Sequence, residues 1–103
     1  MIWRSRIYRE FIQLKPCFVC ETDPLSQAHH HSLEYDGIKS GKRPDTQCLP
    51  TCGKCHDAVE RRDWGYLAQH GLDTYDALNL WARRKMVQYL TEFLEKHNIA
   101  RDR

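Results

Sequence analysis

The stretch CLPTCGKCH, residues 48–56, joins an apolar segment to a pair of cysteines and then to the start of a helical pattern. Two residues separate Cys52 from Cys55, so one small loop can offer both thiolates to the same metal ion. A second pair with the same spacing, Cys17 and Cys20, lies in the segment PCFVC. The two pairs together predict a four-cysteine zinc site.

The segment between the two cysteine pairs is longer than in a common zinc ribbon. About 15–20 residues usually separate such pairs, whereas residues 21–51 separate them here. That length accommodates two strands and a loop. SQAHHHSL predicts a strand over 27–33, and TQCLPTC predicts a second over 46–52. The Gly-, Lys- and Pro-rich stretch EYDGIKSGKRPD, residues 34–45, predicts the loop between them.

Helical patterns lie on both sides of this region. Residues 3–14 predict an N-terminal helix that ends before Pro16 and has Ile7, Phe11 and Leu14 on its apolar face. The cluster Arg4, Arg6 and Arg9 in the same segment is typical of a solvated helix face.

The C-terminal half of the chain predicts three further helical segments. We expect one helix to start just after Cys55, and one or two turns within 63–71 to end at Gly71. Asp73 is the expected N-cap of a long helix over 74–97. Its broad apolar face is typical of core or partner packing; it comprises Leu78, Trp81, Met86, Tyr89, Leu90, Phe93 and Leu94.

The composition indicates one small domain, residues 1–103, without a membrane span. The chain has 103 residues, a net charge of +2 and 41% hydrophobic residues, so its core is lean and a metal site would supplement it. No apolar run is long enough to cross a bilayer, and the N-terminal MIWRSRIYRE lacks a secretory h-region. We therefore expect a cytoplasmic protein whose cysteines are ligands rather than disulfides. The fifth cysteine, Cys48, is expected to be a small buried apolar residue.

Four histidines form the second candidate site. His29, His30 and His31 are consecutive in the first predicted strand, and His56 follows Cys55 at the start of a predicted helix. Because side chains alternate along a strand, His29 and His31 should share one face and His30 should take the other. Imidazoles that converge in this way, with a carboxylate nearby, suit a divalent metal with an open coordination position.

The motifs CFVC, AHHH and PDTQCLPTCGKCH resemble the HNH endonuclease family over about residues 15–62, and most of all its small phage and prophage members. The resemblance implies a mainly helical α+β fold. A ββα-metal (HNH) core would be stapled by the four-cysteine zinc site, between an N-terminal helix and a long C-terminal helix.

The resemblance also implies roles for the histidines. Cys17, Cys20, Cys52 and Cys55 match the zinc ligands of the family, and His56 matches the catalytic-metal ligand that opens the helix. In the His-His version of the motif, His29 would bind the metal and His30 would be the general base. In members with one histidine after the alanine, His29 itself would be the base. Both alignments remain open from the sequence.

Two positions depart from the family pattern. Gln47 stands where the family has its middle Asn, and Glu60 stands where many members have a further histidine. A carboxylate ligates Mg²⁺ or Mn²⁺ readily, so Glu60 is a candidate ligand. Asp45 is a candidate acceptor that would orient the histidines.

The activity implied by the resemblance is metal-dependent hydrolysis of DNA phosphodiester bonds, with Mg²⁺, Mn²⁺ or a similar ion. The expected phosphate contacts are Lys39, Lys42, Arg43, Arg61 and Arg62. The alternative is an inactive, zinc-stabilised DNA- or protein-binding module that acts in recombination or packaging. Under either hypothesis the C-terminal helix could supply the interface of a homodimer or of a complex with another protein.

Overall fold

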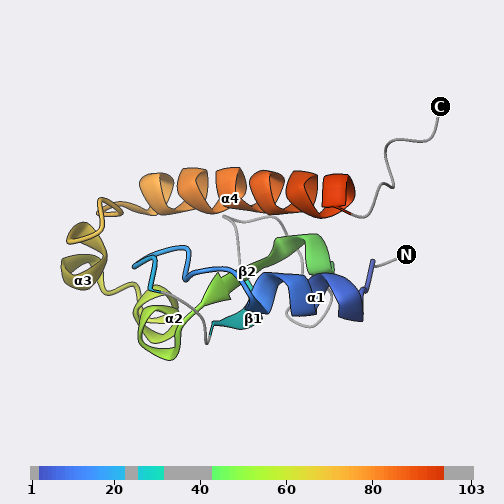
Figure 1. The fold of residues 1–103 in the computed structure, drawn as a ribbon. Helices are drawn as coiled ribbons and strands as arrows, with labels where there is room; N and C mark the ends of the chain where they lie inside the picture. The colour runs from blue at the N-terminus through green and yellow to red at the C-terminus, as the bar shows by residue number, and fades with distance from the viewer. Residues whose placement is uncertain (1–2, 23–25, 32–42, 97–103) are drawn as a thin grey trace.

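The computed structural model describes residues 3–22, 26–31 and 43–96, and it has an α+β architecture (Figure 1). A long C-terminal helix lies along one side of a two-stranded sheet (Figure 1). The N-terminal helix packs near the C-terminal end of that long helix (Figure 1). The elements in chain order are α1 (Arg6–Gln13), β1 (Gln27–His30), the 3₁₀ turn η1 (Asp45–Gln47), β2 (Cys48–Thr51), α2 (Gly53–Glu60), α3 (Trp64–Ala68) and α4 (Tyr75–Lys96).

The two predicted strands pair in an antiparallel sheet. Gln27 lies opposite Thr51, and His30 lies opposite Cys48. Both strands are shorter than predicted, and most of the predicted loop, with the end of the first strand, lies outside the described residues. Pro50 occupies a position inside β2, where its carbonyl accepts a hydrogen bond from the Phe18 N–H at 2.8 Å. This bond fixes the first cysteine loop against the sheet.

The N-terminal helix is shorter than the predicted 3–14: it begins after its N-cap Ser5 and ends at Gln13. Part of its predicted apolar face is also wrong. Ile7 and Leu14 are exposed, whereas Tyr8, Phe11 and Ile12 are buried. The buried residues follow the i, i+3, i+4 spacing of a single helix face. The pattern from Ile7 selects a face one residue away from the true one, because Tyr8 takes the position nearest the core.

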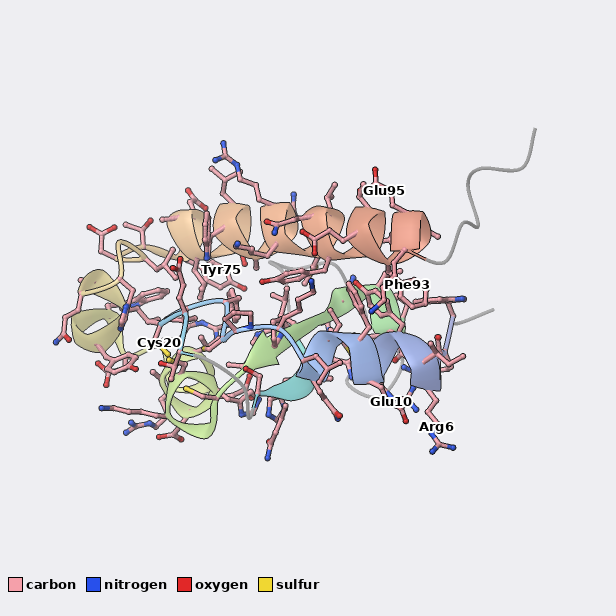
Figure 2. All side chains as sticks on the ribbon, in the orientation of Figure 1. Arg6, Glu10, Cys20, Tyr75, Phe93 and Glu95 are labelled. Carbon is pink, nitrogen blue, oxygen red and sulfur yellow. The ribbon has the colours of Figure 1, made fainter. Side chains whose placement is uncertain are left out.

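Aromatic rings join α1 to the C-terminal part of α4. The Phe93 ring lies 5.0 Å from the Tyr8 ring and 5.4 Å from the Phe11 ring, both edge-on. Arg6 and Glu10 lie on the opposite side of α1, away from α4 (Figure 2). One face of α1 therefore belongs to the core and the other is solvated.

The second helix begins earlier than predicted. It starts at Gly53, with Cys52 as its N-cap, so Cys55 lies inside the first turn rather than before it. It ends at Glu60 in a Schellman motif, in which the Asp63 N–H donates to the Ala58 carbonyl at 2.9 Å.

The turn at Gly71 and the last helix largely follow the sequence pattern. Gly71 has a φ of 79°, the left-handed geometry expected where the helical turns of 63–71 end. The N-cap of α4 is Thr74 rather than Asp73, because the Thr74 hydroxyl accepts from the Ala77 N–H at 3.0 Å. The predicted apolar face of α4 is confirmed: Leu78, Met86, Tyr89 and Phe93 are buried, and Trp81, Leu90 and Leu94 pack against the core.

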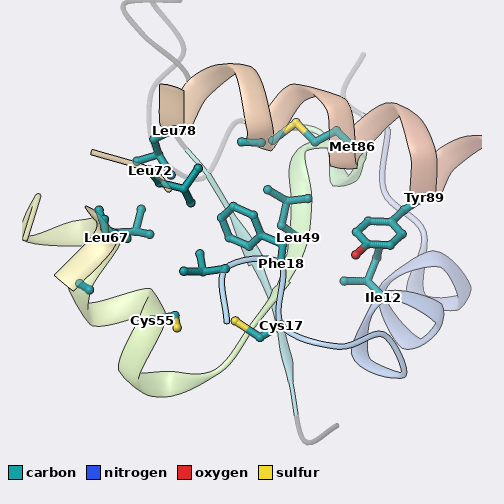
Figure 3. Packing of buried hydrophobic residues seen from close by; sticks show 14 of the residues in the cluster. Ile12, Cys17, Phe18, Leu49, Cys55, Leu67, Leu72, Leu78, Met86 and Tyr89 are labelled. Atoms are coloured by element: carbon teal, nitrogen blue, oxygen red, sulfur yellow. The ribbon is translucent and has the colours of Figure 1, made fainter. Parts of the chain in front are cut away.

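Phe18 and Leu49 lie at the centre of the apolar core, between the cysteine loops and α4 (Figure 3). Cys17 and Cys55 lie on the side of the core away from α4 (Figure 3). Within the described ranges, no helix combines the length and the apolar character needed to cross a membrane.

Candidate metal centre and histidine cluster

The four predicted zinc ligands lie together. The Sγ atoms of Cys17, Cys20, Cys52 and Cys55 are all within 4.8 Å of one another, and those of Cys20 and Cys52 are 3.8 Å apart. A tetrahedral ion with metal–sulfur bonds of about 2.3 Å places its sulfurs about 3.8 Å apart. A disulfide needs about 2.05 Å, and all five cysteines are free thiols. The cluster could therefore hold a metal ion.

Local backbone geometry brings the cysteines to this position. Glu21, with a φ of 59°, turns the chain back directly after Cys20, and its N–H donates to the Cys17 carbonyl at 2.8 Å. Cys52 and Cys55 belong to the N-cap and first turn of α2, where the positive end of the helix dipole favours thiolates.

The protonation of the cysteines depends on their surroundings. Burial raises the pKa of Cys55, although the Tyr66 hydroxyl lies 3.1 Å from its sulfur. Burial would also raise the pKa of Cys20, but hydrogen bonds from Thr22 and the neighbouring cysteines outweigh it and lower the value to about 7. Because metals bind thiolates, metal binding here would release protons.

The histidine run divides between the two faces of β1, as the alternation predicts. The rings of His29 and His56 stack with centroids 3.7 Å apart and an angle of 17° between their planes. The His31 ring lies edge-on to His56 at 6.1 Å. The side chain of His30 takes the other face, where its Nε2 lies 2.9 Å from Asp45 Oδ1.

His31 is a core residue. It is buried, its ring packs against Phe18 at 5.1 Å, and its Nε2 lies 3.0 Å from the Thr51 hydroxyl. Burial lowers the pKa of His31 to about 3, so the imidazole is neutral at physiological pH. The third histidine therefore supports the sheet.

The surroundings of His29 favour its neutral form. Burial lowers the pKa of His29 and the neighbouring His56 lowers it further, while Glu60 acts in the opposite direction. Nε2 of His29 lies 3.0 Å from Gln27 Oε1. With that oxygen as acceptor, Nε2 carries the proton and Nδ1 is free to bind a metal or accept a proton.

Glu60 lies one helical turn after His56 and is exposed. In the part of the chain that the structure describes, the ligand atoms of His29, His56 and Glu60 do not form a group with all separations within 4.8 Å. In stacked rings the nitrogen lone pairs lie in nearly parallel planes and do not converge on one point. A shared ion would therefore require rotation of these side chains.

Asp45 is the centre of a charged cluster on the other face of β1. It is 0% exposed, and Arg9 Nη1 and the Ser5 N–H donate to its Oδ2 at 2.5 and 2.7 Å. Arg4 Nη1 and His30 Nε2 contact its Oδ1 at 3.3 and 2.9 Å. Burial alone would raise the pKa of Asp45, but the bonds from Ser5, His30 and Arg9 hold it below its usual value.

His30, Asp45 and Cys48 also lie within 4.8 Å of one another, but their surroundings disfavour a cation. Arg4 and Arg9 already neutralise Asp45. Cys48 is buried as predicted, and burial raises its pKa to about 12, so its thiol is neutral.

Gln47 and Arg43 support the region around η1. Arg43 is buried and donates to Gln47 Oε1 at 3.1 Å, while the Gln47 carbonyl accepts from the His31 N–H at 3.1 Å. The guanidinium expected to contact phosphate thus lies inside the protein.

The other expected phosphate contacts have varied surroundings. Arg61 pairs with Asp57 at 3.0 Å, and the Arg62 guanidinium lies over the Tyr75 ring at 4.8 Å. Lys39 and Lys42 lie outside the described residues. The structure places Arg4 beside His30 and brings both Arg4 and Arg9 into contact with Asp45, which sequence reasoning missed. The N-terminal arginine cluster was the available signal, but its pairing with Asp45 spans more than thirty positions.

Comparison with known proteins identifies the family of the chain. No curated protein and no solved structure matches it. A family model described as "Protein of unknown function (DUF968)" matches residues 1–97. The match spans α1, the cysteine cluster, both strands and α4. The chain therefore belongs to the DUF968 family.

Proposed function

We propose that this protein is a metal-dependent HNH endonuclease that hydrolyses DNA phosphodiester bonds, with a structural zinc ion bound by its four cysteines. The observation that carries the proposal is the stacking of His29, from a strand, on His56, from the first turn of a helix, at 3.7 Å. The cysteine cluster holds that same helix turn, because Cys52 and Cys55 flank its start.

The assignment of zinc rests on the donor set. Four thiolates in two pairs favour zinc among the common divalent ions, and the Cys20–Cys52 separation of 3.8 Å suits its tetrahedral geometry. Such a closed site has no open position for a substrate. It would act as a support for the loops and for α2.

In the proposed reaction His56 and Glu60, one helical turn apart on α2, would hold a second divalent ion, Mg²⁺ or Mn²⁺. When bound, that ion would neutralise charge on the scissile phosphate and the leaving oxygen. His29, kept neutral by burial, would take a proton from the attacking water at Nδ1. The shared face of His29 and His56 favours His29 over His30 as the base, because His30 points away toward Asp45.

The test is plasmid nicking by purified protein with Mg²⁺ or Mn²⁺, for wild type, His29→Ala and His56→Ala. General acid–base catalysis contributes about 10²–10⁴-fold to a rate, so we expect His29→Ala to lose activity by at least about the lower figure. His56→Ala removes a proposed ligand of the ion and should lose at least as much activity. His70→Ala is the matched control, because His70 is an exposed histidine after α3 whose ring lies against Tyr66 and not against the His29–His56 pair. It should cut like wild type.

Metal analysis and thermal unfolding should accompany the assay, so that a folding defect is recognised. A wild-type protein that carries zinc and binds DNA but never cuts would overturn the nuclease assignment. The binding-module alternative would then describe the chain.

A further inference from the structure

Two hydroxyl groups lie against the sulfurs of the cysteine cluster, one for each CxxC pair. The Tyr66 hydroxyl oxygen is 3.1 Å from Sγ of Cys55, and the Thr22 hydroxyl oxygen is 2.8 Å from Sγ of Cys20. A thiolate has no proton to donate, so in a metal-bound cluster each hydroxyl must be the donor. Each cysteine pair thus has one sulfur that accepts a hydrogen bond from a side chain outside the cluster.

Tyr66 reaches Cys55 from a different helix. It belongs to α3, whereas Cys55 lies in the first turn of α2. The Asp63 carboxylate caps α3 by accepting from the Tyr66 N–H at 3.2 Å, and the Asp63 N–H donates to the Ala58 carbonyl of α2 at 2.9 Å. One residue therefore joins the end of α2 to the start of α3 and brings Tyr66 back beside Cys55.

The ring of Tyr66 also faces a cation. The Lys54 ammonium lies over this ring, 5.3 Å from its centroid, and Lys54 precedes Cys55 in the same turn of α2. A cation over the face of a phenol ring attracts the ring electrons, which makes the hydroxyl a stronger hydrogen-bond donor. The contact with Lys54 thus strengthens donation from Tyr66 to the sulfur.

Thr22 is positioned by the first cysteine loop itself. Its carbonyl accepts from the Cys17 N–H at 3.0 Å, which closes the loop two residues beyond Cys20. The side chain of Thr22 then lies against the sulfur of Cys20 although Thr22 is exposed. Burial in the core therefore does not account for this contact.

We propose that Tyr66 and Thr22 are positioning residues of the zinc site, and that their hydroxyls help to retain the metal by donating to Cys55 and Cys20. Four thiolates around one divalent ion leave an excess of negative charge on the sulfurs, and hydrogen bonds from hydroxyls disperse it. The inference rests on the four-cysteine zinc site of the proposed function and does not depend on nuclease activity. Loss of an outer partner of a metal ligand lowers metal affinity by about 10–100-fold.

The experiment measures metal affinity and the sulfur–metal bond in the full chain. Metal-free protein is titrated with Co²⁺, and Zn²⁺ then displaces the Co²⁺ in competition. Tyr66→Phe keeps the ring and removes only the hydroxyl, so it should lower zinc affinity by about 10–100-fold. The sulfur-to-cobalt charge-transfer band should also move to longer wavelength, because a thiolate without its hydrogen bond gives up an electron more easily.

Tyr75→Phe is the matched control for this variant. The Tyr75 ring lies against the Trp64 ring and the Arg62 guanidinium, and no described contact joins it to a cysteine. It should match wild type in zinc affinity and in the position of the band.

Two variants of Thr22 test the second hydroxyl without a change in the core. Thr22→Val removes the hydroxyl at nearly the same size and should lower the affinity and shift the band, whereas Thr22→Ser keeps the hydroxyl and should behave like wild type. An unchanged band in Tyr66→Phe and Thr22→Val would overturn the inference. This holds even if affinity falls, because the loss would then come from packing.

These outcomes can be told apart from failure of the proposed function. A chain that never nicks plasmid but shows both band shifts has the hydroxyl-supported metal site without the nuclease. A chain that nicks plasmid, with Tyr66→Phe and Thr22→Val spectra like wild type, is a nuclease whose zinc site does not use these hydroxyls. Wild-type protein that binds Co²⁺ without a thiolate band would overturn the zinc site, and this inference with it.

Discussion

The two ends of the molecule are held together by different means, although each depends on a helix of eight residues. At one end α1 buries three large side chains and packs its aromatic rings against Phe93 of α4. At the other end α2 buries Cys55, Ala58 and Val59, which offer much less apolar surface. Since short helices depend on packing for their stability, α2 needs the cysteine cluster where α1 does not. In the proposed zinc-bound protein, metal binding would stabilise the end that contains α2, and apolar packing stabilises the end that contains α1.

The largest effect should come from loss of the metal. Structural zinc sites have apparent binding free energies of about 10–16 kcal/mol at pH 7, so Cys52→Ser should lose the ion and release α2. Hydrogen exchange should then be fast in α2 while α1 and the C-terminal part of α4 keep some protection. Cys48→Ala is the control, because Cys48 is a buried cysteine outside the cluster and its loss should leave the metal content intact. Equal protection of α2 in both variants would remove the proposed difference between the ends.

A substitution in the aromatic contact should instead lower the stability of the protein and leave its metal content unchanged. Phe93→Ala removes a buried ring that touches Tyr8 and Phe11, and should lower the free energy of unfolding by about 3–5 kcal/mol. Urea unfolding measures the loss, and elemental analysis should find the metal still bound. Leu80→Ala, on an exposed position of the same helix, should change the stability by less than about 0.5 kcal/mol. Metal loss in Phe93→Ala would mean that the two ends are one cooperative unit.

The smallest expected effect is the change in stability with pH that comes from His31. Its pKa is about 3 in the folded protein, against a model-peptide value of 6.5. Below pH 6.5 the unfolded chain binds a proton that the folded protein does not, so stability falls as the pH falls. Between pH 7.5 and 5.5 the loss from this group should be about 1.4 kcal/mol.

Comparison of wild type with His31→Gln over that pH range isolates the contribution of His31. Acid also releases metal from thiolates, but that effect is common to both proteins and cancels in the difference. Identical pH profiles would show that His31 is not buried in its neutral form.

Short-range patterns in the sequence predicted much of this arrangement. The CxxC spacing located the cysteine cluster, and strand alternation separated His29 from His30. The buried face of α1 was missed because Ile7 and Tyr8 are adjacent, and each begins a set of apolar residues at helical spacing. The sequence alone does not decide which of the two sets faces the core. The start of α2 was missed because Cys52 acts as an N-cap without a side-chain hydrogen bond.

Contacts between distant segments could not be predicted from local patterns. Asp45 pairs with Arg4 and Arg9, which lie more than thirty residues away along the chain. Arg43 and His31 look solvent-exposed by residue type, yet the packing around η1 and β2 buries both. Such burial follows from how the helices close over the sheet, and no single segment encodes it.

Cys55 and His56 are consecutive residues in the first turn of α2, and this has a consequence for direction. Successive side chains on an α-helix point about 100° apart. One turn of helix therefore sends a thiolate toward the other cysteines and an imidazole toward β1. The angle between the cysteine cluster and the histidine pair is set by the helical repeat, so neither group can rotate about the helix axis without turning the other.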